Sequence, residues 1–196
     1  MSRHWYYRSM RFPAKLQRRP FLAPIGLAAL AWMAAVLVLI VTAWLLAGAR
    51  STTVVVVRHA EKVMDGSPDP ALTDEGQARA ALLARMFGDR PRDHIDAIFV
   101  SPALRNRLTA APLAARLGLA PEIASQDDPR GFARRVLREH RGDRILIVGH
   151  ADTMPALVEA LSGAKDIPPI DAAEYGTMYV ISVPRIGRAN VLSLTY

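Results

Sequence analysis

The stretch Thr-Thr-Val-Val-Val-Val-Arg-His, residues 52–59, decides the fold class. Its β-branched residues predict a strand, and its unbroken apolar run is typical of a strand buried on both faces in a parallel sheet. Arg58 and His59 follow this run directly. We therefore expect a central strand that delivers two polar side chains to one edge of a sheet.

Strand and helix patterns alternate along the rest of the chain after residue 60. This alternation predicts an α/β fold, a three-layer sandwich with a mostly parallel central sheet. Helices are expected over 73–87, 104–117, 129–140 and 153–161, and strands over 95–100, 144–148, 177–183 and 189–194.

Local signals mark the ends of two of these helices. Thr73 can cap the helix over 73–87, and Gly118 is a stop signal for the helix over 104–117. Helical spacing also predicts which face of the first helix is buried. The residues that share this face are Ala78, Leu82, Leu83 and Met86.

The segment 20–49 carries no charged residue and is mostly Ala, Leu, Val and Ile. About twenty apolar residues cross a bilayer, and this stretch has no polar face for a soluble core. We expect residues 21–49 to form one transmembrane signal-anchor helix ahead of the sandwich. The alternatives are a signal peptide cut after Ala49 and a mitochondrial presequence that precedes an anchor.

The charge is distributed unevenly between the two parts of the chain. Residues 1–50 hold seven Lys/Arg and no acidic residue, whereas 51–196 hold eighteen residues of each sign. Excess positive charge ahead of the span predicts a cytoplasmic arm over 1–20 and a domain over 51–196 outside the cytoplasm. The predicted location is the inner (cytoplasmic) membrane, crossed once.

The formal neutrality of 51–196 argues against a nucleic-acid partner. The local run Arg130, Arg134, Arg135 and Arg138 has the spacing of a solvated helix face. The chain has no cysteine, which excludes disulfides, thiolate metal sites and a cysteine nucleophile.

Polar residues follow three of the predicted strands. Arg58 and His59 come after the first, Arg105 lies in Ser-Pro-Ala-Leu-Arg (101–105) after the second, and His150 follows the strand over 144–148. The carboxyl ends of parallel strands meet at one edge, where such sheets bind their ligands. The sequence thus predicts a site that contains two histidines and two arginines.

These side chains suit phosphoryl transfer. A neutral imidazole can attack phosphorus and carry the phosphoryl group as a covalent intermediate. The guanidinium fork matches two phosphate oxygens and stays charged at any working pH. Two arginines in one pocket would repel a cation, so we expect no metal and no cofactor.

Four stretches together resemble the histidine phosphatase superfamily, also called phosphoglycerate-mutase-like. They are Val-Arg-His-Ala-Glu-Lys (57–62), Leu-Thr-Asp-Glu-Gly-Gln-Ala-Arg-Ala (72–80), Val-Ser-Pro-Ala-Leu-Arg-Asn-Arg-Leu-Thr-Ala (100–110) and Val-Gly-His-Ala-Asp-Thr (148–153). The resemblance implies that His59 is the nucleophile and that Arg58, Arg105 and His150 bind the phosphate. It implies no metal.

Two positions depart from the family pattern. Ala60 stands where the first motif often has glycine, and Asp65 stands where members that resemble true mutases often have asparagine. The domain is also short, with little inserted sequence to enclose a phosphosugar. A hydrolase is therefore favoured over a mutase.

The general acid is open between several carboxyl groups. Asp128, or its neighbour Asp127, precedes the third helix, roughly where many family members keep their acid. Asp152 lies two residues after His150, and Glu61 is a third candidate. Asp128 and Asp152 could instead cap the helices that follow them.

The sequence thus predicts a membrane-anchored phosphatase that hydrolyses a phosphate monoester through a phosphohistidine. A phosphorylated small molecule or glycan, such as an envelope sugar, is the expected substrate. The lipopolysaccharide core heptose phosphate phosphatases are similar in carrying this domain in an exported setting. The alternatives are a protein phosphatase acting on phosphoserine, phosphothreonine or phosphohistidine, similar to the anchored mitochondrial members, and a non-catalytic phosphate-binding membrane module.

Overall fold

The computed structural model describes residues 23–47, 50–89 and 94–196. These fall into two compact units, one ending at Trp44 and one beginning at Leu45. The helix α1 runs from Ala23 to Ala47, mostly within the first unit, and its segment Gly26–Leu45 is long and apolar enough to cross a membrane. The predicted basic arm over 1–20 lies outside the described residues.

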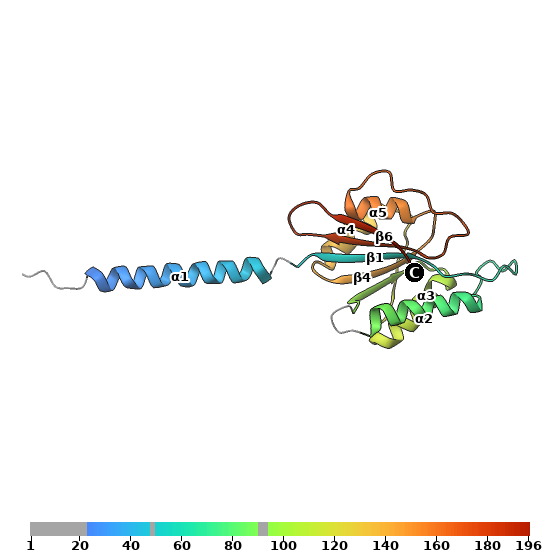
Figure 1. The fold of residues 1–196 in the computed structure, drawn as a ribbon, viewed down its shortest axis with the longest axis horizontal. Helices are drawn as coiled ribbons and strands as arrows, with labels where there is room; N and C mark the ends of the chain where they lie inside the picture. Colours follow the sequence, from blue (N-terminus) through green and yellow to red (C-terminus); the bar gives the residue numbers. More distant parts are fainter. Residues whose placement is uncertain (1–22, 48–49, 90–93) are drawn as a thin grey trace, which may run out of the picture. The chain divides into compact units, whose positions relative to one another are not determined.

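The second unit is built on a six-stranded sheet with the order β3-β2-β4-β1-β5-β6 (Figure 1). β1 pairs in parallel with β4 on one side and antiparallel with β5 on the other, and β2 continues the parallel part. The strands are β1 (Thr52–Arg58), β2 (Ala97–Val100), β3 (Glu122–Ile123), β4 (Arg144–Gly149), β5 (Thr177–Val183) and β6 (Asn190–Thr195).

Helices cover both faces of this sheet, α2 and α3 on one and α4 and α5 on the other (Figure 1). Alternate valines of β1 point into the two cores. Val54 and Val56 pack with α4 and α5, and Val55 and Val57 pack with α2 and α3. The predicted three-layer sandwich is confirmed. Its helices are α2 (Asp74–Gly88), α3 (Leu104–Leu117), α4 (Pro129–Glu139) and α5 (Met154–Ser162).

The predicted helix ends are confirmed, but only part of the predicted buried face of α2 is correct, since Leu83 is buried and Leu82 is half-buried. Thr73 caps α2 by accepting from the Gly76 amide, and Gly118 ends α3 in the left-handed conformation with φ 66°. Ala78 and Met86 are exposed. The residues that α2 buries are Gly76, Ala80, Leu83 and Ala84. Which face is buried depends on where α3 and the chain after β1 lie, and neither is encoded within the helix.

Gly76 is required by a close approach between α2 and the chain after β1. A Cβ at this position would lie 2.3 Å from the backbone oxygen of Glu61. That oxygen already accepts from the Thr73 amide at 2.9 Å, so it is held in place. A side chain at position 76 would therefore push the first turn of α2 away from Glu61.

Gly76→Ala is expected to destabilise the domain by about 1–3 kcal/mol, the usual cost of overpacking, despite the better helix propensity of alanine. Thermal unfolding of the full chain in detergent measures this. The matched control is Gly88→Ala in the same helix, where the new Cβ meets only the flexible side chain of Arg116. Equal stability of the two variants would contradict the close-approach argument.

Candidate active site

His59 lies directly after β1 with its ring almost fully buried. Its backbone amide donates to the oxygen of Gly149 at 3.0 Å, which fixes the chain between the ends of β1 and β4. Its Nδ1 lies 2.8 Å from the carbonyl oxygen of Ala60. A carbonyl oxygen can only accept, so Nδ1 carries the ring proton and Nε2 is left with a lone pair.

The surroundings of His59 keep this ring neutral. Burial lowers its pKa most, the hydrogen bond to Ala60 opposes it, and the charges of Arg105 and Arg58 lower it further, so that the pKa falls to about 4. An imidazole with this pKa is unprotonated throughout the physiological range. His59 therefore presents a nucleophilic nitrogen without needing a separate base.

Arg58, the last residue of β1, is 6% exposed. Its Nη1 donates to the backbone oxygens of Asp171 and Glu174 at 3.0 and 2.7 Å. Its guanidinium stacks 4.0 Å above the centre of the Tyr175 ring. Its Nε is buried and has no hydrogen-bond partner within the structure. The guanidinium is thus held in place by the segment 171–175 while Nε is left to donate.

Arg105 and His150 form the opposite wall of the site. Arg105 comes from the first turn of α3, and its Nη2 lies 3.4 Å from Nδ1 of His150. A guanidinium can only donate, so Nδ1 accepts, and Nε2 of His150 donates to Oγ of Ser101 at 2.9 Å. Burial and the charge of Arg105 lower the pKa of His150, although Asp152 opposes this. Nε of Arg105, like that of Arg58, is buried without a partner.

All four predicted residues line one cavity of about 630 Å³. The rings of His59 and His150 approach edge to face, with their centroids 5.4 Å apart. The structure therefore places them together at the carboxyl edge of the sheet. The remaining lining residues are Asp127, Ala151, Asp152, Thr153, Pro155, Pro169, Ile170 and Ala172.

The candidate acids are placed differently from one another. Asp128 is exposed, accepts from the Gly131 amide at 2.9 Å as the N-cap of α4, and is not among the residues that line the cavity. Its neighbour Asp127 and the other candidate, Asp152, both line it. The Asp128 carboxylate is engaged in capping α4. Asp127 and Asp152 line the cavity and are therefore the better candidates for the general acid.

Glu61 is held in an ion pair with Arg79 and is not among the residues that line the cavity. Its carboxylate accepts from Nε and Nη2 of Arg79 at 2.6–3.0 Å. Burial alone would raise the pKa of Glu61, but the hydrogen bonds and charge of Arg79 hold it below its ordinary value. A carboxyl group kept ionised in this way is a poor proton donor.

Within the described ranges, no group of three or more His, Asp or Glu is arranged to hold a metal ion.

Two residues that support the site have no role in the prediction from sequence. Thr109 accepts from the Ala60 amide at 2.9 Å and donates to the Arg105 oxygen at 2.7 Å, so it links the chain after His59 to the first turn of α3. Tyr175 lies between the predicted helix over 153–161 and the predicted strand over 177–183, where the sequence predicts no regular element. Its contact with Arg58 joins residues 117 positions apart, which no local pattern encodes.

The folded state keeps His59 neutral, so the stability of the domain is expected to fall in acid. The ordinary pKa is 6.5 and the folded value is about 4. The unfolded chain therefore binds the proton first, and the associated stability is fully present above pH 6.5 and is lost as the pH falls toward 4. One pKa unit corresponds to about 1.4 kcal/mol.

Thermal midpoints of the full chain and of His59→Gln, measured at pH 7.5 and 4.5, test this expectation. The midpoint should fall less in the variant, because the buried imidazole is gone. His150 is present in both chains and cancels in the comparison. An equal fall in both chains would contradict a depressed pKa at His59.

Comparison with known proteins supplies independent information on this site. Residues 54–128, which contain Arg58, His59 and Arg105, match the model of the histidine phosphatase superfamily (branch 1). No curated protein matches the chain.

Several solved structures share the fold. The tungstate complex of the protein histidine phosphatase SixA has a TM-score of 0.62 and 19% identity, over 73% of this chain and 96% of that chain. Mycobacterial glucosyl-3-phosphoglycerate phosphatase has a TM-score of 0.54 and 16% identity, over 72% and 97%. A putative alpha-ribazole-5′-P phosphatase from Escherichia coli has a TM-score of 0.56 and 16% identity, over 74% and 97%. At these identities the likeness shows the fold alone.

Proposed function

We infer that this chain belongs to the histidine phosphatase superfamily, whose model matches residues 54–128, and we propose that it hydrolyses a phosphate monoester through a phosphohistidine on His59. One observation carries the proposal. The neutral His59 ring, with Nε2 unprotonated, shares a cavity with two arginines whose buried Nε atoms have no partner. Buried donors without partners are costly, and phosphate oxygens would satisfy both.

In the first step, Nε2 of His59 attacks phosphorus and the bond from phosphorus to the ester oxygen breaks. Arg58 and Arg105 donate to the phosphoryl oxygens and offset their charge in the transition state. The carbonyl oxygen of Ala60, which accepts from Nδ1, stabilises the positive charge that the ring acquires. The leaving oxygen takes a proton from Asp127 or Asp152, whose carboxyl groups line the same cavity.

In the second step, water attacks the phosphohistidine. The phosphorus–nitrogen bond breaks, Nε2 recovers its lone pair, and the carboxylate that gave up its proton accepts one from water. No metal is needed, because the two guanidinium groups supply the positive charge.

His150 contributes a further contact to the phosphoryl group. In the absence of ligand its pKa is lowered by burial and by Arg105, so the neutral form dominates. A phosphate dianion in the cavity counters the arginine charges and favours protonation at Nδ1. The protonated ring then donates from Nδ1 to phosphate and from Nε2 to Ser101.

The anchor and the charge pattern support a location outside the cytoplasm. α1 is apolar enough to span a membrane, and the basic residues lie ahead of it in the sequence. We place the domain on the outer side of the inner membrane, acting on a phosphorylated small molecule or glycan. A periplasm-dependent reporter fused after Tyr196 should be active, and a silent fusion would reverse this orientation.

Trapping of the covalent intermediate tests the proposed chemistry directly. The full chain in detergent is mixed with a ³²P-labelled aryl phosphate and quenched within milliseconds. We expect label that is stable in alkali, labile in acid and located on the peptide that contains His59. A chain that hydrolyses the ester without retaining such label would exclude the two-step route.

A further inference from the structure

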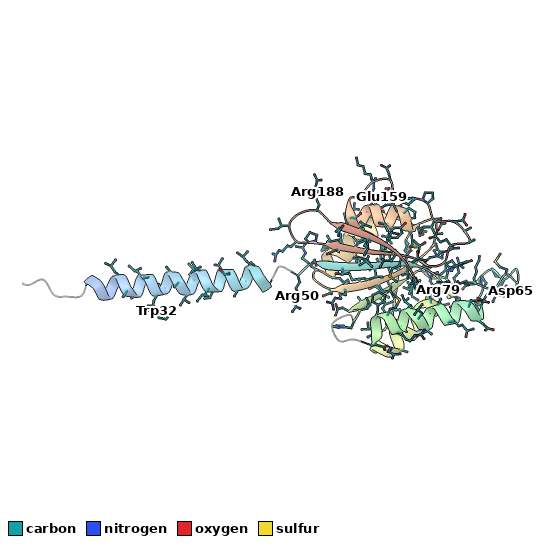
Figure 2. The ribbon with its side chains drawn as sticks, viewed as in Figure 1. Trp32, Arg50, Asp65, Arg79, Glu159 and Arg188 are labelled. Carbon is teal, nitrogen blue, oxygen red and sulfur yellow. The ribbon has the colours of Figure 1, made fainter. Side chains whose placement is uncertain are left out.

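The end of the sheet opposite His59 carries a cluster of arginines, here called the basal face. Arg50 precedes β1, and the pairing of Thr52 with Val183 brings the turn after β5 beside it. Two cavities, of about 530 and 220 Å³, flank Arg50. Figure 2 shows Arg50 and Arg188 at one end of the domain and Asp65 at the other. The basal face consists of Arg50, Arg141, Arg144, Arg185 and Arg188.

Two of the described acidic residues beside this face contact histidine rings. Asp96 lies 2.9 Å from Nε2 of His94 and accepts from the backbone amide of Arg144 at 2.8 Å. Asp143 lies 3.1 Å from Nδ1 of His140. Within the described ranges, the five arginines of the basal face outnumber the two carboxylates beside it, so positive charge is in excess there even though the domain as a whole is formally neutral.

An exposed apolar residue stands within this positive surface. Ile186, in the turn between β5 and β6, is 89% exposed and has Arg185 and Arg188 close on either side in the sequence. A single exposed apolar residue is common on protein surfaces, so the argument depends on the two cations that flank Ile186. This combination suits a bilayer surface, because apolar tips enter the headgroup region while flanking arginines bind phosphate.

We propose that the basal face binds the headgroup phosphates of anionic phospholipids, with Ile186 entering the interface. A membrane is the favoured partner because only residues 48–51 separate the apolar helix α1 from β1. If α1 spans a bilayer, so short a connection keeps β1 close to the bilayer surface. Each arginine near an anionic surface strengthens binding about fivefold. The proposal rests on α1 being a membrane span and is independent of the catalytic chemistry.

The absence of cysteine makes this testable in the full chain. Ile186→Cys is labelled with an environment-sensitive fluorophore and reconstituted in nanodiscs that carry nitroxide-labelled lipid as quencher. The nanodiscs contain phosphatidylcholine alone or with about one third phosphatidylglycerol. The matched control is Met64→Cys, whose parent side chain is 84% exposed in the loop after β1, near the catalytic end.

We expect at least twofold stronger quenching of the label at position 186 in anionic nanodiscs than in neutral ones, and no such difference at position 64. Adding Arg185→Glu and Arg188→Glu should return the label at position 186 to its level in neutral lipid. Arg107→Glu, an exposed arginine of α3, should not. Hydrolysis of a soluble aryl phosphate should be unchanged by the double charge reversal.

Three results would overturn the proposal. They are equal quenching at the two positions, equal quenching in the two lipids, and insensitivity to charge reversal. A chain that does not enter nanodiscs would overturn it as well, because the placement depends on α1 as an anchor. Since the aryl phosphate assay is run in parallel, loss of lipid binding is distinguished from failure of the proposed phosphatase activity.

Discussion

His59→Ala is expected to reduce kcat/KM for an aryl phosphate by about 1,000-fold or more. Removing a covalent nucleophile abolishes the two-step route and leaves only catalysis by binding and charge stabilisation. The substitution leaves a gap where the ring was, beside the carbonyl oxygen of Ala60 and the ring of His150. Free imidazole should therefore restore part of the activity.

The control is His94→Ala, at the opposite end of the sheet, where the ring pairs with Asp96 at the surface. This variant should keep wild-type kcat and KM. Both assays are repeated with a chelator, which should change neither rate. Undiminished turnover by His59→Ala would sink the assignment of the nucleophile, and chelator-sensitive turnover would sink the metal-free mechanism.

Arg58→Lys is expected to lower kcat/KM by about 100-fold or more even though the positive charge is kept. An ammonium group cannot hold the backbone oxygens of Asp171 and Glu174, stack on Tyr175 and still donate sideways to phosphate. The loss should appear in kcat as well as KM, because the arginine contacts charge that develops in the transition state.

Two matched variants separate catalysis from folding. Arg105→Lys removes a guanidinium that is proposed to bind phosphate but does not hold the segment 171–175, so its loss should be smaller than that of Arg58→Lys. Arg79→Lys weakens the ion pair with Glu61 and should leave the rate within a few fold. If Arg79→Lys were as damaging as Arg58→Lys, general loosening of the domain would explain both effects.

The elements that the sequence predicts well are those whose signals are local. The valine run of β1 and the left-handed Gly118 each depend on a few adjacent residues. The convergence of Arg58, Arg105 and His150 was also predictable, because parallel strands bring their carboxyl ends to one edge.

The features that sequence reasoning missed depend on contacts between distant segments. The buried face of α2 follows from its approach to Glu61, and β3 has only two residues, both exposed. Asp127 is a better candidate for the general acid than Asp128, because Asp128 is the residue that caps α4. The stacking of Tyr175 on Arg58 needs the whole of β5 in place.

The length of β1 has a consequence for the choice of substrate. Its seven residues span roughly 20 Å at the usual rise per residue, from the basal end of the strand to the end that His59 directly follows. A domain resting on lipid through its basal face would hold its nucleophile that far above the headgroups. Phosphates embedded at headgroup level, including those of ordinary phospholipids, would then be out of reach. Phosphates on diffusible molecules, or at the far end of a long glycan, would be within it.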